Sequence, residues 1–213
     1  MSSVWDSRAD AYRAATEQAE GEDLDTIVAW ARTRAGVTVL DVATGGGHAA
    51  RRLRDGGANV VTADASPGMQ PDVICHAEDL PFADGSFDVV ACRIAAHHFE
   101  DVGAAVGEMA RVSRGPVLVE DTLYEDGQVE EAERLRDPSH VRSYSEREWH
   151  DFFARAGLSV EEVALVEKRH PVDEWLARAG CSGEEAAHVR ELLADRIVDG
   201  AYVDRKILLR GRK

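Results

Sequence analysis

The chain has 213 residues, of which 44% are hydrophobic, and a formal net charge of −15 at pH 7. This length and apolar content suffice for one folded domain and exclude a disordered chain. The acidic balance argues against a nucleic-acid substrate, because a surface that follows phosphates should be basic, and it favours a neutral or cationic small molecule. No apolar run approaches the roughly 20 residues of a membrane helix. The polar N-terminus does not resemble a signal peptide, so we expect a cytoplasmic protein without a membrane partner.

The first predicted elements are helical. Residues 5–32 have an amphipathic helical pattern that is interrupted around Gly21. This segment precedes the first strand, where a cover over a ligand site would lie, and we therefore predict that residues 1–35 form a helical lid.

From residue 36 onward, strands and helices alternate. The patterns predict strands at 38–42, 59–63, 72–75, 87–92 and 116–120 and helices at 47–55 and 101–112. This alternation indicates a parallel sheet with helices on both faces, in a cofactor-binding core of residues 36–121. Between Asp64 and Val73, prolines and a glycine leave room for no more than a loop or a single helical turn.

The remaining residues, 122–213, are predicted to form a substrate-side segment followed by C-terminal helices and strands, within a single domain of 1–213. Helices are predicted at 123–136, 145–157, 171–179 and 184–197, and strands at 158–166 and 202–209. Ser145 and Glu148 have the spacing of a capping box. The acidic run 125–133 is interpreted as a solvated helix face.

The most informative stretch is residues 39–47, VLDVATGGG. A short apolar strand runs into glycines and then a helical segment, as at the ligand end of a Rossmann-like unit. Glycines are needed there because a side chain would hold a ligand away from the backbone, and because the turn can require positive φ. Asp64 closes the next strand, where its carboxylate can accept hydrogen bonds from ribose hydroxyls. The pattern therefore predicts a nucleoside-type cofactor site.

Two cofactors compete for this motif. Gly45, Gly47 and Ala50 also satisfy the dinucleotide fingerprint, with Asp64 close to the expected spacing of about 20 residues. The glycines alone therefore leave an NAD(P)-linked oxidoreductase open. Asp41, on the strand before the glycines, favours a cofactor with an amino group and a sulfonium, because a pyrophosphate gains nothing from so close a carboxylate. The balance favours S-adenosylmethionine over NAD.

Later motifs sharpen this interpretation. Residues 77–90 (AEDLPFADGSFDVV) and 92–99 (CRIAAHHF) resemble the strand-four region of class I S-adenosylmethionine-dependent methyltransferases of the ubiquinone/menaquinone-biosynthesis type, the type 11 methyltransferases. Residues 108–112 (EMARV) and 136–142 (RDPSHVR) continue the resemblance, which runs from about Trp5 to the C-terminus. It implies an α/β, Rossmann-like, doubly wound sheet of seven strands in the order 3-2-1-4-5-7-6, with strand 7 antiparallel and helices on both faces.

The resemblance also implies roles for individual residues. Around the methionine part of S-adenosylmethionine it places Asp41, Ala43, Gly45, Gly47 and Arg93. Against the ribose and the adenine it places Asp64, Ala65, Met69, Ala77, Glu78, Asp79 and Leu80. Tyr12 would close the site from the N-terminal helix.

Two departures from the family pattern bear on the cofactor. His76 stands where relatives usually have an aspartate for the adenine amino group, and the helix after Asp64 is nearly deleted. A neutral imidazole can accept one hydrogen bond, but it is bulkier and pH-sensitive. We therefore expect a more open adenine pocket and weaker cofactor binding. The alternative is a methyltransferase-fold protein that binds a ligand or partner without methyl transfer.

The leading hypothesis is methyl transfer to a small-molecule acceptor, by C- or O-methylation of a quinone-like, phenolic or other secondary metabolite. Positioning supplies most of the acceleration in such a displacement, and a base is needed only where the nucleophile loses a proton. The candidate bases are His98, His97 and His140, with His98 preferred. Each could instead cap a helix or bond a carbonyl group. No group of His, Cys and acidic residues has the spacing of metal ligands, so we predict no metal. We expect a monomer or a homodimer.

Overall fold

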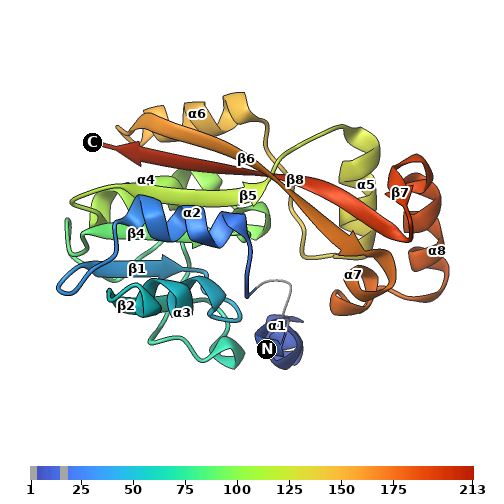
Figure 1. Cartoon of the computed structure of the whole chain (residues 1–213), viewed down its shortest axis with the longest axis horizontal. Coiled ribbons are helices and arrows are strands. Elements are labelled where there is room, and N and C mark those ends of the chain that lie inside the picture. The colour runs from blue at the N-terminus through green and yellow to red at the C-terminus, as the bar shows by residue number, and fades with distance from the viewer. Residues whose placement is uncertain (1–3, 15–18) are drawn as a thin grey trace.

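The computed structural model describes residues 4–14 and 19–213. Within these ranges one sheet carries eight strands in the order β3-β2-β1-β4-β5-β8-β6, and the short β7 pairs with β8 (Figure 1). The strands are β1 (Thr38–Val42), β2 (Asn59–Asp64), β3 (Val73–Ile74), β4 (Val89–Arg93), β5 (Val117–Thr122), β6 (Ser159–Pro171), β7 (Ile197–Val198) and β8 (Ala201–Arg212). β8 runs antiparallel to both β5 and β6. The predicted strand order is confirmed, with β7 as an addition.

The helices follow the predicted pattern closely. They are α1 (Val4–Ala14), α2 (Glu22–Ala31), α3 (His48–Asp55), α4 (Val102–Val112), α5 (Gly127–Arg136), α6 (Glu146–Arg155), α7 (Val172–Arg178) and α8 (Gly183–Leu192). The crossover after Asp64 is a single 3₁₀ turn, η2 (Pro67–Met69), and the capping box of Ser145 and Glu148 is present at the start of α6. Both details are confirmed. The predicted last helix ends early, because the chain turns at a second 3₁₀ segment into β7.

Helices cover both faces of the sheet. On one face, α2 and α3 pack against the strands through Ile27 and Leu53. On the other, α4 and α6 contribute Met109, Trp149 and Phe153, all of them fully buried. Burial of side chains of this size contributes about 1.5–3 kcal/mol each. These two layers hold the carboxyl ends of β1, β2, β4 and β5 at one edge of the sheet.

A third cluster forms at the far ends of β6 and β8. There α5, α7 and α8 pack around Trp175 and Tyr202, and Figure 1 shows them as a separate group of helices at the right-hand end of the sheet. We call α5, α7 and α8 the cap. Glu130 and Glu133 of α5 are buried, so the interpretation of the acidic run as a solvated face is wrong for both. The reason is that α5 packs against α8 and that both acids have partners inside the molecule, Glu130 with His140 and Glu133 with Arg136.

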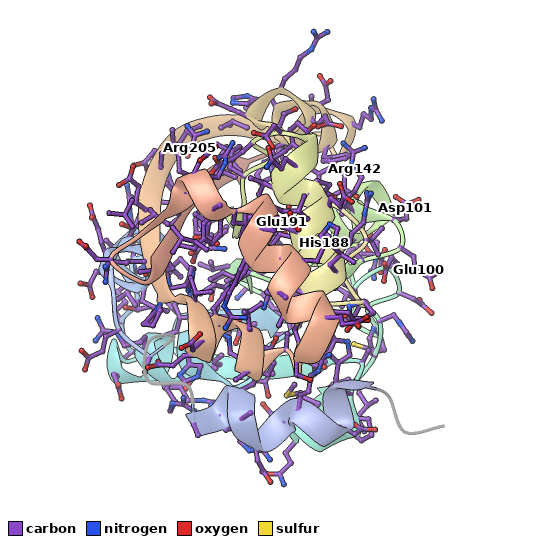
Figure 2. All side chains as sticks on the ribbon, turned by 90° about the vertical axis from the view of Figure 1, so that its right-hand side faces the viewer. Glu100, Asp101, Arg142, His188, Glu191 and Arg205 are labelled. Carbon is purple, nitrogen blue, oxygen red and sulfur yellow. The ribbon has the colours of Figure 1, made fainter. Side chains whose placement is uncertain are left out.

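α1 connects the cap to the crossover after β2. Asp6 accepts hydrogen bonds from the hydroxyl of Ser66 (2.5 Å) and the backbone N–H of Gly68 (2.8 Å). Arg8 donates to Asp137 at the end of α5 (2.9 Å). In Figure 2, which looks onto the cap, α1 lies below α8, whose His188 and Glu191 are labelled. None of the described helices is both long and apolar enough to cross a membrane.

Candidate active site

A cavity of about 870 Å³ lies at the carboxyl ends of the parallel strands. Ligands bind at this edge in doubly wound sheets, and the volume is typical of small-molecule sites. Two groups of residues line it. The cofactor lobe is lined from the loops after β1, β2, β3 and β4. The cap lobe is lined by Thr122, Glu133, Arg136, His170, Trp175, Arg178, Asp204 and Lys206. Trp5 and Tyr12 of α1 line the cavity as well.

The structure brings most of the predicted site residues together. All of them except Gly47, Asp79 and His140 line the cavity. Gly47 caps the start of α3, and Asp79 lies in the turn before Leu80. His140 is buried, and its Nε2 lies 3.1 Å from Glu130. The cofactor lobe therefore consists largely of residues that the sequence motifs indicate.

The glycine loop leaves space for a ligand. Gly45 has a φ of +50°, and a Cβ added to it would meet nothing within 4 Å. At Gly46, in contrast, a Cβ would lie 2.5 Å from the carbonyl oxygen of Tyr12, so that glycine is required by the close approach of α1. Ala43 and Ile94, directly after β1 and β4, also have positive φ, at 52° and 51°. Such strained residues cluster at functional sites, and here both line the cavity.

Two carboxylates face the cofactor lobe. Asp64 accepts hydrogen bonds from the backbone N–H groups of Gly45 and Ser66, each at 2.9 Å. Each of its oxygens keeps a second lone pair for another donor, and burial raises its pKa. Asp41 is 1% exposed and accepts a hydrogen bond from the Thr44 hydroxyl (2.6 Å). Burial raises the pKa of Asp41 to about 6, against the effect of that hydrogen bond.

Arg93 is held by buried acids that the sequence motifs did not indicate. Its Nε donates to Asp23 of α2 (2.9 Å) and to Glu120 of β5 (3.0 Å), and Nζ of Lys168 lies 2.7 Å from the same Asp23 oxygen. Burial acts to raise the pKa of Asp23, but Arg93 and Lys168 lower it to about 2. Burial raises the pKa of Glu120 to about 7. A charged residue near the end of an apolar strand, as at Glu120, is the one signal that could have pointed to this cluster.

The histidine pair at the end of β4 has two different environments. Nδ1 of His97 lies 2.5 Å from one oxygen of Asp121, and the His97 backbone N–H donates to the other (2.7 Å). Because a carboxylate only accepts, His97 carries its proton on Nδ1, and Nε2 is left with no hydrogen-bond partner among the residues that the structure describes. Burial holds the pKa of His98 well below its usual range, and its Nδ1 donates to the carbonyl oxygen of Ser139 (3.0 Å).

The cap lobe holds buried ion pairs that the sequence analysis also missed. Arg136 pairs with Glu133 (3.0 Å), and its guanidinium lies 4.4 Å from the centre of the Trp175 ring. Lys206 donates to Asp204 and to the Thr122 hydroxyl, each at 2.6 Å. These side chains come from α5, α7, β5 and β8. Only the packing of the cap against the sheet brings them to one cavity.

Comparisons with known proteins agree with this geometry. The family model for a methyltransferase domain matches residues 40–116. The uncharacterized methyltransferase YcgJ of Bacillus subtilis is 34% identical over 203 residues, which are 85% of this chain and 80% of that protein. The crystal structure of YcgJ covers 90% of this chain and 97% of that one, with a TM-score of 0.80 and 29% identity.

Two further relatives are more distant. A demethylmenaquinone methyltransferase of Beutenbergia cavernae is 41% identical over 91 residues, 38% of either protein. Geranyl diphosphate C-methyltransferase from Streptomyces coelicolor, solved with S-adenosyl-L-homocysteine, has a TM-score of 0.64 at 14% identity, covers 89% of this chain and 74% of that one, and shows the same fold. With YcgJ similar over four-fifths of its length and the sheet order of the family in place, the chain belongs to the class I S-adenosylmethionine-dependent methyltransferases of type 11 and is a methyltransferase.

Proposed function

We propose that this enzyme transfers a methyl group from S-adenosylmethionine to a small-molecule acceptor held in the same cavity. The observation that carries the proposal is that one cavity is lined both by the glycine loop with Asp64 and by side chains at the cap. One lobe is built from the glycine loop and Asp64, and the other extends to the cap. Methyl transfer requires a cofactor and an acceptor side by side, and the cavity offers separate surroundings for each.

The residues of the cofactor lobe fit S-adenosylmethionine, which supplies a methyl group from its sulfonium when bound. The open face of Gly45 admits a ligand to the backbone, and Asp64 has lone pairs for two ribose hydroxyls. Met69 and Leu80 are buried apolar side chains on the cavity wall and would contact the adenine. Asp41 would face the positively charged methionine part, where a cation lowers the cost of its buried charge.

We assign the role of general base to His97 instead of the neighbouring His98. Its Nε2 can accept a proton from an acceptor hydroxyl or an activated ring carbon, while Nδ1–H remains bonded to Asp121. The Asp121 carboxylate stabilises the imidazolium that results. Burial acts to raise the pKa of Asp121, but its interaction with His97 lowers that pKa below the usual value. Burial lowers the pKa of His98 and keeps it neutral, so it would orient the acceptor. Asp121 therefore acts as a positioning residue.

α1 would exclude water from the reacting groups. Trp5 packs edge-on against His98, with ring centres 4.6 Å apart. The bonds of Asp6 and Arg8 hold the helix between the η2 turn and the cap. Because α1 is bonded to the η2 turn through Asp6 and to the cap through Arg8, it would cover the cavity between the two lobes.

Isothermal titration calorimetry with S-adenosylmethionine, S-adenosylhomocysteine and NADH tests the cofactor. We expect both sulfur ligands to bind and NADH not to bind; the reverse result would overturn the proposal. Incubation with phenolic and quinone-like acceptors, followed by mass spectrometry, then tests the transfer. Cofactor binding without methylated product from any acceptor would favour the alternative of a ligand-binding protein. His97→Gln should lose transfer while its affinity for S-adenosylhomocysteine stays unchanged.

A further inference from the structure

We infer that the cap lobe is a subsite for a carboxylate, so that the acceptor is a small organic acid. The inference rests on the proposed function, because it names the class of molecule that would receive the methyl group. It is carried by Arg136 of α5 and Lys206 of β8, two buried cationic residues that line the same cavity. Of the residues that line this lobe, Arg136 alone belongs to a sequence motif, as the first residue of 136–142.

The guanidinium of Arg136 is placed to bind a planar anion. The residue is 8% exposed, and its guanidinium carbon lies 4.4 Å from the centre of the Trp175 ring, within the range of a cation–π contact. Glu133 takes the side of the guanidinium that carries Nε and Nη2. Within residues 4–14 and 19–213, Nη1 has no hydrogen-bond partner. An arginine fork held in this way suits a carboxylate, which it can bind with two parallel N–H donors.

Lys206 of β8 supplies a second cation to the same cavity. Its ammonium donates two hydrogen bonds, to Asp204 and to Thr122, and an ammonium has three N–H groups. The described part of the chain offers no acceptor for the third. The residue is 4% exposed, so this donor can be satisfied only inside the cavity. Arg178 of α7 lines the same lobe and adds a further positive charge.

The acids of the lobe lie beside cationic or basic side chains of the protein. Oδ2 of Asp204 accepts a hydrogen bond from Lys206. Its other oxygen lies 3.2 Å from Nε2 of His170 without a hydrogen bond between them. Burial acts to raise the pKa of Asp204, but Lys206 and His170 hold it well below its usual range. Glu133 is paired with Arg136. An amine entering the lobe would have to compete with Lys206, Arg136 and His170 for these acids. A carboxylate would instead meet N–H groups of Arg136 and Lys206 that have no acceptor among the described residues. The local charge thus opposes the preference for cations that the net charge of −15 suggested.

The position of the lobe fixes how an acid would lie. Thr122, which lines it, follows Asp121 directly, and Asp121 holds His97. A molecule whose carboxylate reaches Arg136 and Lys206 therefore extends toward His97 and the cofactor lobe. The aromatic rings of Trp5 and Trp175 on the cavity wall favour a flat or unsaturated body between the two ends. The structure assigns an acid with a methylatable hydroxyl or carbon at its far end.

Matched probes test the charge requirement directly. Benzoate, 4-hydroxybenzoate and cinnamate are titrated into the protein with and without saturating S-adenosylhomocysteine, beside their primary amides and benzylamine, with ligand-observed NMR as readout. We expect the acids to bind about tenfold or more tightly than the amides. Equal binding of acids and amides, tighter binding of benzylamine, or no binding of any acid would overturn the proposal.

Variants locate the effect. The double variant Glu133→Gln/Arg136→Gln removes the buried pair together, so that no unpaired charge is left behind, and it should lose the preference for acids. Lys206→Met tests the second cation, on β8, independently. Arg134→Gln, on the same helix but with its side chain 55% exposed, is the control and should keep the preference. Retention of the preference in both cap-lobe variants would refute the subsite. If the wild-type protein does not bind S-adenosylhomocysteine, the proposed function is contradicted. The acid titrations carried out without S-adenosylhomocysteine still decide whether the subsite exists.

Discussion

Replacing Asp41 by asparagine should stabilise the protein while weakening its cofactor site. The carboxyl is buried at the end of β1, and burial raises its pKa to about 6 from 3.8. A pKa that is raised on folding means that the group's contribution to stability is complete below pH 3.8 and is lost as the pH rises through 6. Each unit of pKa shift corresponds to about 1.36 kcal/mol, so the rise from 3.8 to about 6 lowers the free energy of unfolding at pH 8 by about 3 kcal/mol. Asparagine is neutral at every pH and can still accept the Thr44 hydrogen bond.

Urea denaturation of wild type and Asp41→Asn without cofactor, at pH 8 and pH 4, measures this difference. We expect the variant to be more stable by up to about 3 kcal/mol at pH 8 and by less than about 1 kcal/mol at pH 4. Asp72→Asn is the matched control with the opposite sign, because Thr62 donates to Asp72 and lowers its pKa. A variant that is no more stable at pH 8, or that gains equally at both pH values, would refute the reasoning.

The same variant probes the ligand. Asp41 would face the positively charged part of S-adenosylmethionine, and S-adenosylhomocysteine lacks the sulfonium charge. Calorimetry with Asp41→Asn should therefore show a larger loss of affinity for S-adenosylmethionine than for S-adenosylhomocysteine. Equal losses for the two ligands would place the sulfonium away from this carboxylate.

Three further variants test other parts of the structure. Gly45→Val fills the open face of the loop at a φ of +50°, so S-adenosylhomocysteine binding should be lost together with about 1–2 kcal/mol of stability; unchanged affinity in calorimetry would remove the proposed site. His97→Gln should lower kcat by about 10²–10⁴ with unchanged S-adenosylhomocysteine affinity, and a variant with unchanged kcat would exclude it as the base. Trp149→Ala opens a cavity under α6, where the side chain is fully buried, and should cost about 3–5 kcal/mol in urea denaturation; a cost below 1 kcal/mol would contradict its place in the core.

Local sequence patterns were sufficient to predict the strands of the core, the glycine loop and the position of Asp64. The run from Val39 to Gly47 combines β-branched residues, glycines and a helix start within a few positions, and its geometry depends mainly on those neighbours. The prolines at 67 and 71 likewise restrict the crossover to a single turn wherever the segment lies. The resemblance to the type 11 methyltransferases added the order of the strands, which periodicity alone does not specify.

The cap lobe and the charged clusters depended on tertiary structure. Arg93 and Asp23 are 70 residues apart, and Lys206 and Thr122 are 84 apart, so no local pattern links them. Helical periodicity shows which residues of α5 share a face. Glu133 is nevertheless buried, because other elements of the molecule cover the polar face of α5 as well. The propensities of neighbouring residues therefore sufficed for strands, turns and the glycine loop. The packing of distant elements decided which charged side chains were removed from water and which of them line the cap lobe.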